Sequence, residues 1–193
     1  MRNSKGFTLI ELLAVIIILA IVALVTTPTI TSTINNSRLE GAKDKAWGTI
    51  KSVNLAYTEK DTNTSTKDLS VTLPLKIVFD KVDETSKTGG KIATVNGLGS
   101  GDAYKAINDN FSVNGEVPQD GYIYFAKSGK IYASNLKYTG NGTYYCTTAN
   151  EGQSMVCDKD KITDGAKVDD TTTDNVAAKV TEDGYTDTTT TQQ

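Results

Sequence analysis

A single carboxylate inside an apolar run is the first feature of this sequence that calls for chemistry. From Phe7 to Val25 the residues are apolar except for Thr8 and Glu11. A run of this length is typical of a helix that spans a membrane. A carboxylate costs ~2.5 to 3.5 kcal/mol at the centre of a bilayer and less near its surface, so Glu11 indicates a cationic partner.

The other residue types argue against an enzyme. The chain has 193 residues and contains no histidine, no nucleophile motif, no glycine-rich phosphate loop and no thiol–histidine pair. Its remaining acidic residues are typical of a solvated surface, not of a catalytic pair of carboxylates. We therefore expect no catalytic residues and no cofactor.

The N-terminal stretch resembles the start of a type IV prepilin. A short basic leader ends at Gly6, and Phe7, Thr8, Glu11 and the apolar run follow it. The resemblance implies that a prepilin peptidase cuts after Gly6 and methylates the new amine of Phe7. It also implies subunit assembly through Glu11 and Phe7, because the carboxylate of an incoming subunit offsets the buried ammonium of a neighbour.

Two simpler interpretations of the apolar run stay open. A secretory signal peptide has a shorter core and a cleavage site of small residues, whereas this run contains Glu11 and meets Thr26-Thr27-Pro28. A plain membrane anchor explains the apolar run but requires neither Gly6-Phe7 nor Glu11. Arg2 and Lys5 precede the run and no basic cluster follows it, so the N-terminus is expected in the cytoplasm.

The helix is expected to continue beyond the membrane. Pro28 removes one backbone hydrogen bond and predicts a kink. Apolar residues then recur at three- and four-residue spacing, which predicts an amphipathic helix with one face for a globular domain: Leu39, Ala42, Ala46, Ile50, Val53 and Tyr57. The expected parts are a leader at 1–6, a transmembrane and assembly helix at 7–28, the amphipathic half at 29–60 and a globular β-domain at 61–193.

The β-domain shows several short strand patterns. A strand is expected over 71–79, where Pro74 indicates a sheet edge or a break, and another over 91–96. The clearest signal is a hairpin of 121–126 and 131–134, rich in tyrosine. Residues 143–148 and 154–157 can pair as a further hairpin. The patterns predict a loop at 61–68, irregular chain at 97–110 and an antiparallel meander overall.

The two cysteines are expected to pair. If Glu151 and Gly152 form the two-residue turn of the second hairpin, Cys146 lies directly opposite Cys157, and this geometry suits a disulfide. An extracellular location favours the oxidised pair. A zinc site is not expected, because the chain offers only two thiols and no histidine.

The C-terminal region, residues 158–193, is rich in threonine and aspartate and predicts short strands or a mobile tail. Calcium is one hypothesis, since pilin-like secretion subunits of the family that the chain resembles can bind it near the C-terminus. The aspartate spacing fits no EF-hand loop, so we expect a solvated acidic surface and no metal. The net charge of −3 and the lack of a basic block give no support for nucleic-acid binding.

The resemblance predicts an α+β pilin fold, with a long bent N-terminal helix packed on an antiparallel β-sheet. It implies the major structural subunit of a type IV pilus, a homopolymer built by the pilus assembly machinery for adhesion, aggregation and twitching motility. The subunit would lie in the cytoplasmic membrane before assembly and in an extracellular pilus afterwards. The alternatives are a minor pilin or pseudopilin of a secretion or DNA-uptake system, and a membrane-anchored extracellular binding module.

Overall fold

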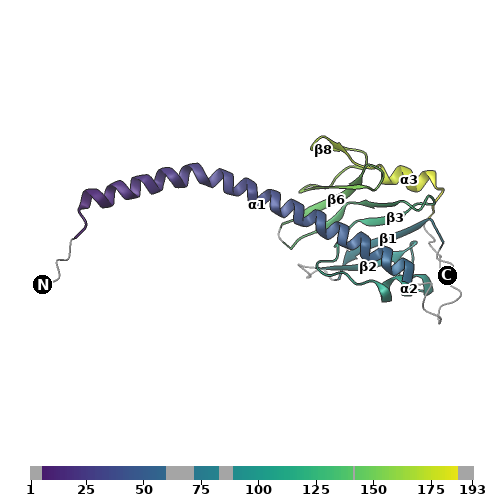
Figure 1. The fold of residues 1–193 in the computed structure, drawn as a ribbon. Coiled ribbons are helices and arrows are strands. Elements are labelled where there is room, and N and C mark those ends of the chain that lie inside the picture. Colours follow the sequence, from purple (N-terminus) through teal and green to yellow (C-terminus); the bar gives the residue numbers. More distant parts are fainter. Residues whose placement is uncertain (1–5, 60–71, 83–88, 141, 187–193) are drawn as a thin grey trace. The chain divides into compact units, whose positions relative to one another are not determined.

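The computed structural model describes residues 6–59, 72–82, 89–140 and 142–186 (Figure 1). It has an α+β fold, as expected, in which a long N-terminal helix, α1 (Leu9–Glu59), precedes antiparallel sheets. Two further helices are short, α2 (Asp102–Asn110) and α3 (Val176–Glu182). The strands are β1 (Leu75–Lys81), β2 (Gly90–Val95), β3 (Tyr122–Phe125), β4 (Ile131–Ser134), β5 (Leu136–Tyr138), β6 (Tyr144–Ala149), β7 (Ser154–Asp158), β8 (Lys167–Val168) and β9 (Thr171–Thr172).

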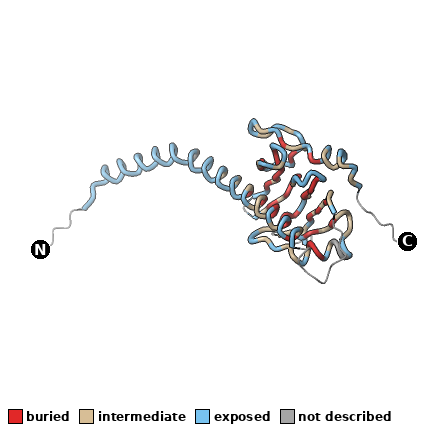
Figure 2. Tube along the Cα trace, turned by 45° about the vertical axis from the view of Figure 1, so that its right-hand side comes forward, coloured by how far each residue is buried: buried red, intermediate tan, exposed pale blue. Residues whose placement is uncertain are grey.

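The chain divides into two units, Met1–Arg38 and Leu39–Gln193. In the first unit α1 continues through Pro28 as an uninterrupted helix. Every side chain described between Gly6 and Ile34 is exposed, as the pale blue stretch of Figure 2 shows. The kink predicted at Pro28 stays a prediction, and the leader residues 1–5 lie outside the described residues.

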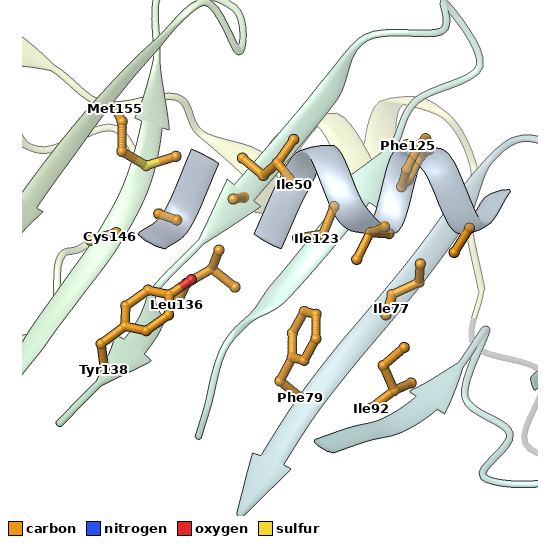
Figure 3. Packing of buried hydrophobic residues seen from close by; sticks show 14 of the residues in the cluster. Ile50, Ile77, Phe79, Ile92, Ile123, Phe125, Leu136, Tyr138, Cys146 and Met155 are labelled. Atoms are coloured by element: carbon orange, nitrogen blue, oxygen red, sulfur yellow. The ribbon is translucent and has the colours of Figure 1, made fainter. Parts of the chain in front are cut away.

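The second unit is built on the amphipathic part of α1. The apolar stripe predicted from the sequence is confirmed, since Ala42, Ala46, Ile50 and Val53 are all buried. They pack in one core with Leu75 and with further strand residues that Figure 3 labels: Ile77, Phe79, Ile92, Ile123, Phe125, Leu136, Tyr138, Cys146 and Met155. Burial of this face stabilises the second half of the helix more than its intrinsic propensity does.

Two sheets share this core. The first has the strand order β2-β1-β3-β4 and the second has the order β5-β6-β7. The chain passes from the first sheet to the second at Asn135, a buried residue in the left-handed backbone region. Gly121 lies against this crossing, where an added Cβ would come within 2.4 Å of the Asn135 carbonyl oxygen. Only a glycine fits there, so the close approach of the two segments depends on it.

The faces turned away from α1 are covered by the C-terminal region. Val176 of α3 packs with Tyr124 and Tyr132 of the first sheet. Ile162 packs with Ala149 and Val156 of the second sheet. Each sheet therefore lies between α1 and the C-terminal region, and apolar residues point to both of its faces.

Several predictions about the β-domain need correction. The β-domain is not one meander. Its strands form a four-stranded, a three-stranded and a two-stranded sheet, and the chain passes from the first to the second at Asn135 without a glycine-rich turn. The stretch 97–110, predicted to be irregular, contains α2, whose Ala106 and Ile107 are buried. β1 lies between β2 and β3 and is not an edge strand, and Pro74 stands just before it as a break. The loop predicted at 61–68 and part of the first predicted strand lie outside the described residues.

Candidate assembly site

At the start of α1, Thr8 and Glu11 are hydrogen-bonded to each other. The Glu11 Oε2 atom accepts hydrogen bonds from the Thr8 backbone N–H at 2.9 Å and from the Thr8 hydroxyl at 2.8 Å. The Glu11 N–H donates in return to the Thr8 hydroxyl oxygen at 3.4 Å. Thr8 and Glu11 thus form a capping box, which satisfies donors that the helix start leaves without an intrahelical partner.

The role of Thr8 was missed in the sequence, although its signal was present. The pattern Thr-x-x-Glu before an apolar run is the sequence signature of a capping box, and Thr8-Leu9-Ile10-Glu11 fits it. The charge of Glu11 by itself does not reveal this second role. Glu11 therefore both carries a charge and fixes where the helix begins.

The peptide bond between Gly6 and Phe7 lies outside the helix. Residues 6–8 have no regular structure and are exposed, and the Phe7 side chain is 86% exposed. Since α1 begins at Leu9, both sides of this bond are accessible in the isolated subunit. That is the local geometry a peptidase requires, and it leaves Phe7 close to Glu11 along the chain.

The apolar side chains from Phe7 to Val25 cover all sides of the first part of α1. Exposed large apolar residues run along it without a polar stripe, among them Leu9, Leu12, Ile16, Leu19, Val22 and Val25. The helix is long and apolar enough to cross a membrane, and its most apolar stretch is not buried. A helix that is apolar all round is stable only in a membrane or inside other protein.

A buried carboxylate, Glu116, ties α1 to the β5–β6 connection. It accepts a hydrogen bond from the Lys45 ammonium at 2.8 Å and from the N–H groups of Thr139 at 2.6 Å and Gly140 at 3.1 Å. Burial by itself would raise the pKa of Glu116. The bonds from Lys45, Thr139 and Gly140 outweigh this and hold the pKa below its ordinary value.

The C-terminal acids do not form the purely solvated surface that the sequence predicted. Asp174 accepts the N–H groups of Glu151 and Gly152, at 2.8 Å each. Asp183 accepts from the Tyr124 hydroxyl at 2.7 Å, and burial together with this carboxylate raises the pKa of Tyr124.

Asp164 makes a third such connection, since it accepts from the Ser134 hydroxyl at 2.8 Å and from the Ala177 N–H at 3.1 Å. These aspartates anchor the C-terminal region to the sheets. Among the described residues no three acidic or sulfur-bearing side chains are grouped as a metal site would require.

The cysteines lie where the hairpin register predicts them. Cys146 of β6 is directly opposite Cys157 of β7, and their Sγ atoms are bonded. The predicted register is confirmed, but the connection is longer than two residues, since β6 ends at Ala149 and β7 begins at Ser154. Asn150, Glu151 and Gly152 all have positive φ, and the Gln153 N–H donates to the Asn150 carbonyl. Both cysteines are buried in the core beneath α1.

Comparison with known proteins identifies one region. Residues 1–27 match the family model described as the prokaryotic N-terminal methylation motif. No curated protein matches the chain. No solved structure matches it either. The motif implies processing by a prepilin peptidase and a pilus assembly context. The matched region is the type IV prepilin signature, and in this chain it stands at the start of a long helix that antiparallel sheets follow.

Proposed function

We propose that this chain is the major structural subunit of a type IV pilus, cut after Gly6, methylated at Phe7 and polymerised through the apolar half of α1 for adhesion, aggregation and twitching motility. The observation that carries the proposal is the fully exposed apolar helix with one carboxylate in its first turn. Outside the membrane such helices must pack together, because each Leu, Ile or Val left in water costs about 1.5 to 3 kcal/mol relative to a buried one.

The two oxygens of Glu11 suggest how one carboxylate serves both the helix and the fibre. Both bonds from Thr8 go to Oε2, and within the described residues no bond to Oε1 occurs. A carboxylate has lone pairs for several donors, so Oε1 is available to the Phe7 ammonium of a neighbouring subunit. The capping bonds would hold the charge in place before the neighbour arrives.

This arrangement favours subunit pairing over a plain anchor. In a bilayer, Glu11 is partly compensated by Thr8, which lowers the cost of keeping it there before assembly. In a dry fibre core the same carboxylate offsets a cation that would otherwise be buried without a partner. A plain anchor also benefits from the cap, but it has no neighbouring cation for the carboxylate charge to offset.

The test is the chemical state and location of the mature chain. In surface fibres removed by shearing, N-terminal peptide mass analysis should find a chain that begins at Phe7 with a methylated amine, and the chain should be the most abundant fibre protein.

The control is a Gly6→Leu variant, which should stay uncut in the membrane fraction because its scissile site is blocked. A methylated chain that is scarce in the fibres would instead identify a minor pilin or a pseudopilin. An uncut chain in the membrane of the unaltered strain would overturn the proposal in favour of a tethered binding module.

A further inference from the structure

We propose that the bond between Asn114 and Gly115 is a site of spontaneous deamidation, and that the fold protects the comparable sites elsewhere in the described chain. In this reaction the Gly115 nitrogen attacks the Asn114 side-chain carbon Cγ, and ammonia leaves as a cyclic imide closes. Water then opens the imide to give aspartate or isoaspartate. The inference does not rest on the proposed function.

The reaction needs a free side chain followed by an unshielded backbone nitrogen. The sequence contains six pairs of Asn or Asp followed by Gly, which begin at Asn96, Asn114, Asp120, Asn141, Asp164 and Asp183. Asn141 lies outside the described residues. The other five share the same local chemistry, so the surrounding structure decides which of them reacts.

Asn96 is held in two ways. Its Oδ1 atom accepts hydrogen bonds from the Lys76 N–H at 2.9 Å and from the Tyr185 hydroxyl at 3.2 Å. Its backbone lies in a turn closed by the reciprocal bonds of Val95 and Leu98. The Asn96 side chain would have to lose both of its bonds before the nitrogen of the next residue could attack it.

The aspartate pairs are held by the contacts that anchor the C-terminal region. Asp164 and Asp183 each accept two hydrogen bonds. Asp120 pairs with Lys161, and the Gly121 residue that follows it is buried. Carboxylates are also poorer targets for attack than an amide, so these sites react more slowly for a second reason.

Asn114 differs from all of these. It is exposed in the connection between α2 and β3, and no hydrogen bond within the described residues holds its side chain. Gly115 is exposed as well, and an added Cβ would meet nothing within 4 Å. Of the described pairs, this one alone combines a free amide with an open, glycine nitrogen.

Deamidation of Asn114 would affect the contacts of Glu116, which lies close to it in the sequence. Two residues further on, the buried Glu116 carboxylate holds Lys45 of α1 and the backbone of Thr139 and Gly140. Aspartate at 114 adds a negative charge near this contact, and isoaspartate also lengthens the main chain beside it. Deamidation should therefore loosen the attachment of α1 to the β5–β6 connection as the protein ages.

The test is peptide mass mapping of the full chain in detergent, incubated at mildly alkaline pH and sampled over time. Asn114 should convert at least about tenfold faster than Asn96, which corresponds to ~1.4 kcal/mol of additional barrier at Asn96. In denaturant the two rates should become similar, because both residues precede glycine. An Asn114→Gln variant should lose the fast conversion and keep the slow one.

Two results would overturn the proposal. One is a rate at Asn114 in the folded chain that is no higher than the rate at Asn96. The other is a rate difference that persists unchanged in denaturant, since the fold would then have no part in it. Asn114→Asp supplies the charged product directly, and its melting temperature should lie below that of the unaltered chain.

Discussion

The ionisation of Glu116 contributes to the stability of the second unit. Its side chain is only 7% exposed, and it accepts charged and backbone donors from segments far apart in the sequence. Hydrogen bonds to a charged group typically contribute about 1.5 to 3 kcal/mol. A neutral replacement keeps the shape of the side chain but loses that charge.

Glu116→Gln should therefore lower the free energy of unfolding near neutral pH and have little effect in acid. Because the pKa of Glu116 is lowered in the folded state, its stabilisation is complete above the unfolded pKa of about 4.3 and is lost as the pH falls through the lower folded value. Urea unfolding across this pH range measures the difference between the two proteins.

The matched control is Glu40→Gln. Glu40 pairs with Lys43 on the helix surface, where its side chain is 67% exposed, and exposed pairs contribute about 0 to 1 kcal/mol. A loss of stability for Glu116→Gln that stayed constant down to strongly acidic pH would contradict the role given to its charge.

At the scale of elements, aspartate side chains attach the C-terminal region to the sheets by hydrogen bonds. Asp174→Ala removes the acceptor for two N–H groups of the β6–β7 turn. It should cost about 1 to 3 kcal/mol, since those groups would lose their partner. Chemical denaturation measures the change, and Asp160→Ala, at an exposed position, should leave stability nearly unchanged. Equal losses of stability for the two substitutions would contradict the role given to the Asp174 hydrogen bonds.

The sequence predicted the elements that carry a local signal. The spacing of Ala42, Ala46 and Ile50 defined the buried face of α1, and the tyrosine-rich hairpin and the Cys146–Cys157 register followed from turn residues. It did not predict α2, because the glycines just before it suggest loop. Nor did it predict the change of sheet at Asn135, which depends on contacts with distant segments such as Ile162.

The candidate site was predictable only in part. The charge of Glu11 and the glycine before Phe7 stand out in the sequence, whereas the capping role of Thr8 became clear from its hydrogen bonds. The Asp174 and Asp183 contacts were hidden because an acid that binds a backbone N–H far away in sequence looks like any surface acid.

At the scale of the whole molecule, the apolar surface and the folded core belong to different units. The second unit, Leu39–Gln193, contains the entire core, and the exposed apolar side chains are concentrated before it. A truncated protein that begins at Asn35 should be a soluble monomer by size-exclusion chromatography and sedimentation. The mature full-length chain, as the comparison, should need detergent. Aggregation of the truncated protein would place part of the assembly surface in the second unit.

In the proposed fibre, the charge of Glu11 joins one subunit to the next. A valine side chain is less costly in a bilayer than a glutamate side chain, so the Glu11→Val variant should insert and be cut after Gly6. The variant should form no fibres, since removing one partner of a buried ion pair typically costs ~3 to 5 kcal/mol. Glu11→Gln separates the two roles of the residue, because its side-chain oxygen can still accept the bonds from Thr8 but carries no charge.

The decisive measurement is electron microscopy of strains that carry only one of these variants, with the processed chain followed in the membrane fraction. Both variants should be cut, should accumulate in the membrane and should form no fibres. Normal fibres from Glu11→Gln would show that the capping bonds suffice and would contradict the role of the charge. Normal fibres from Glu11→Val would contradict any role of this side chain in assembly.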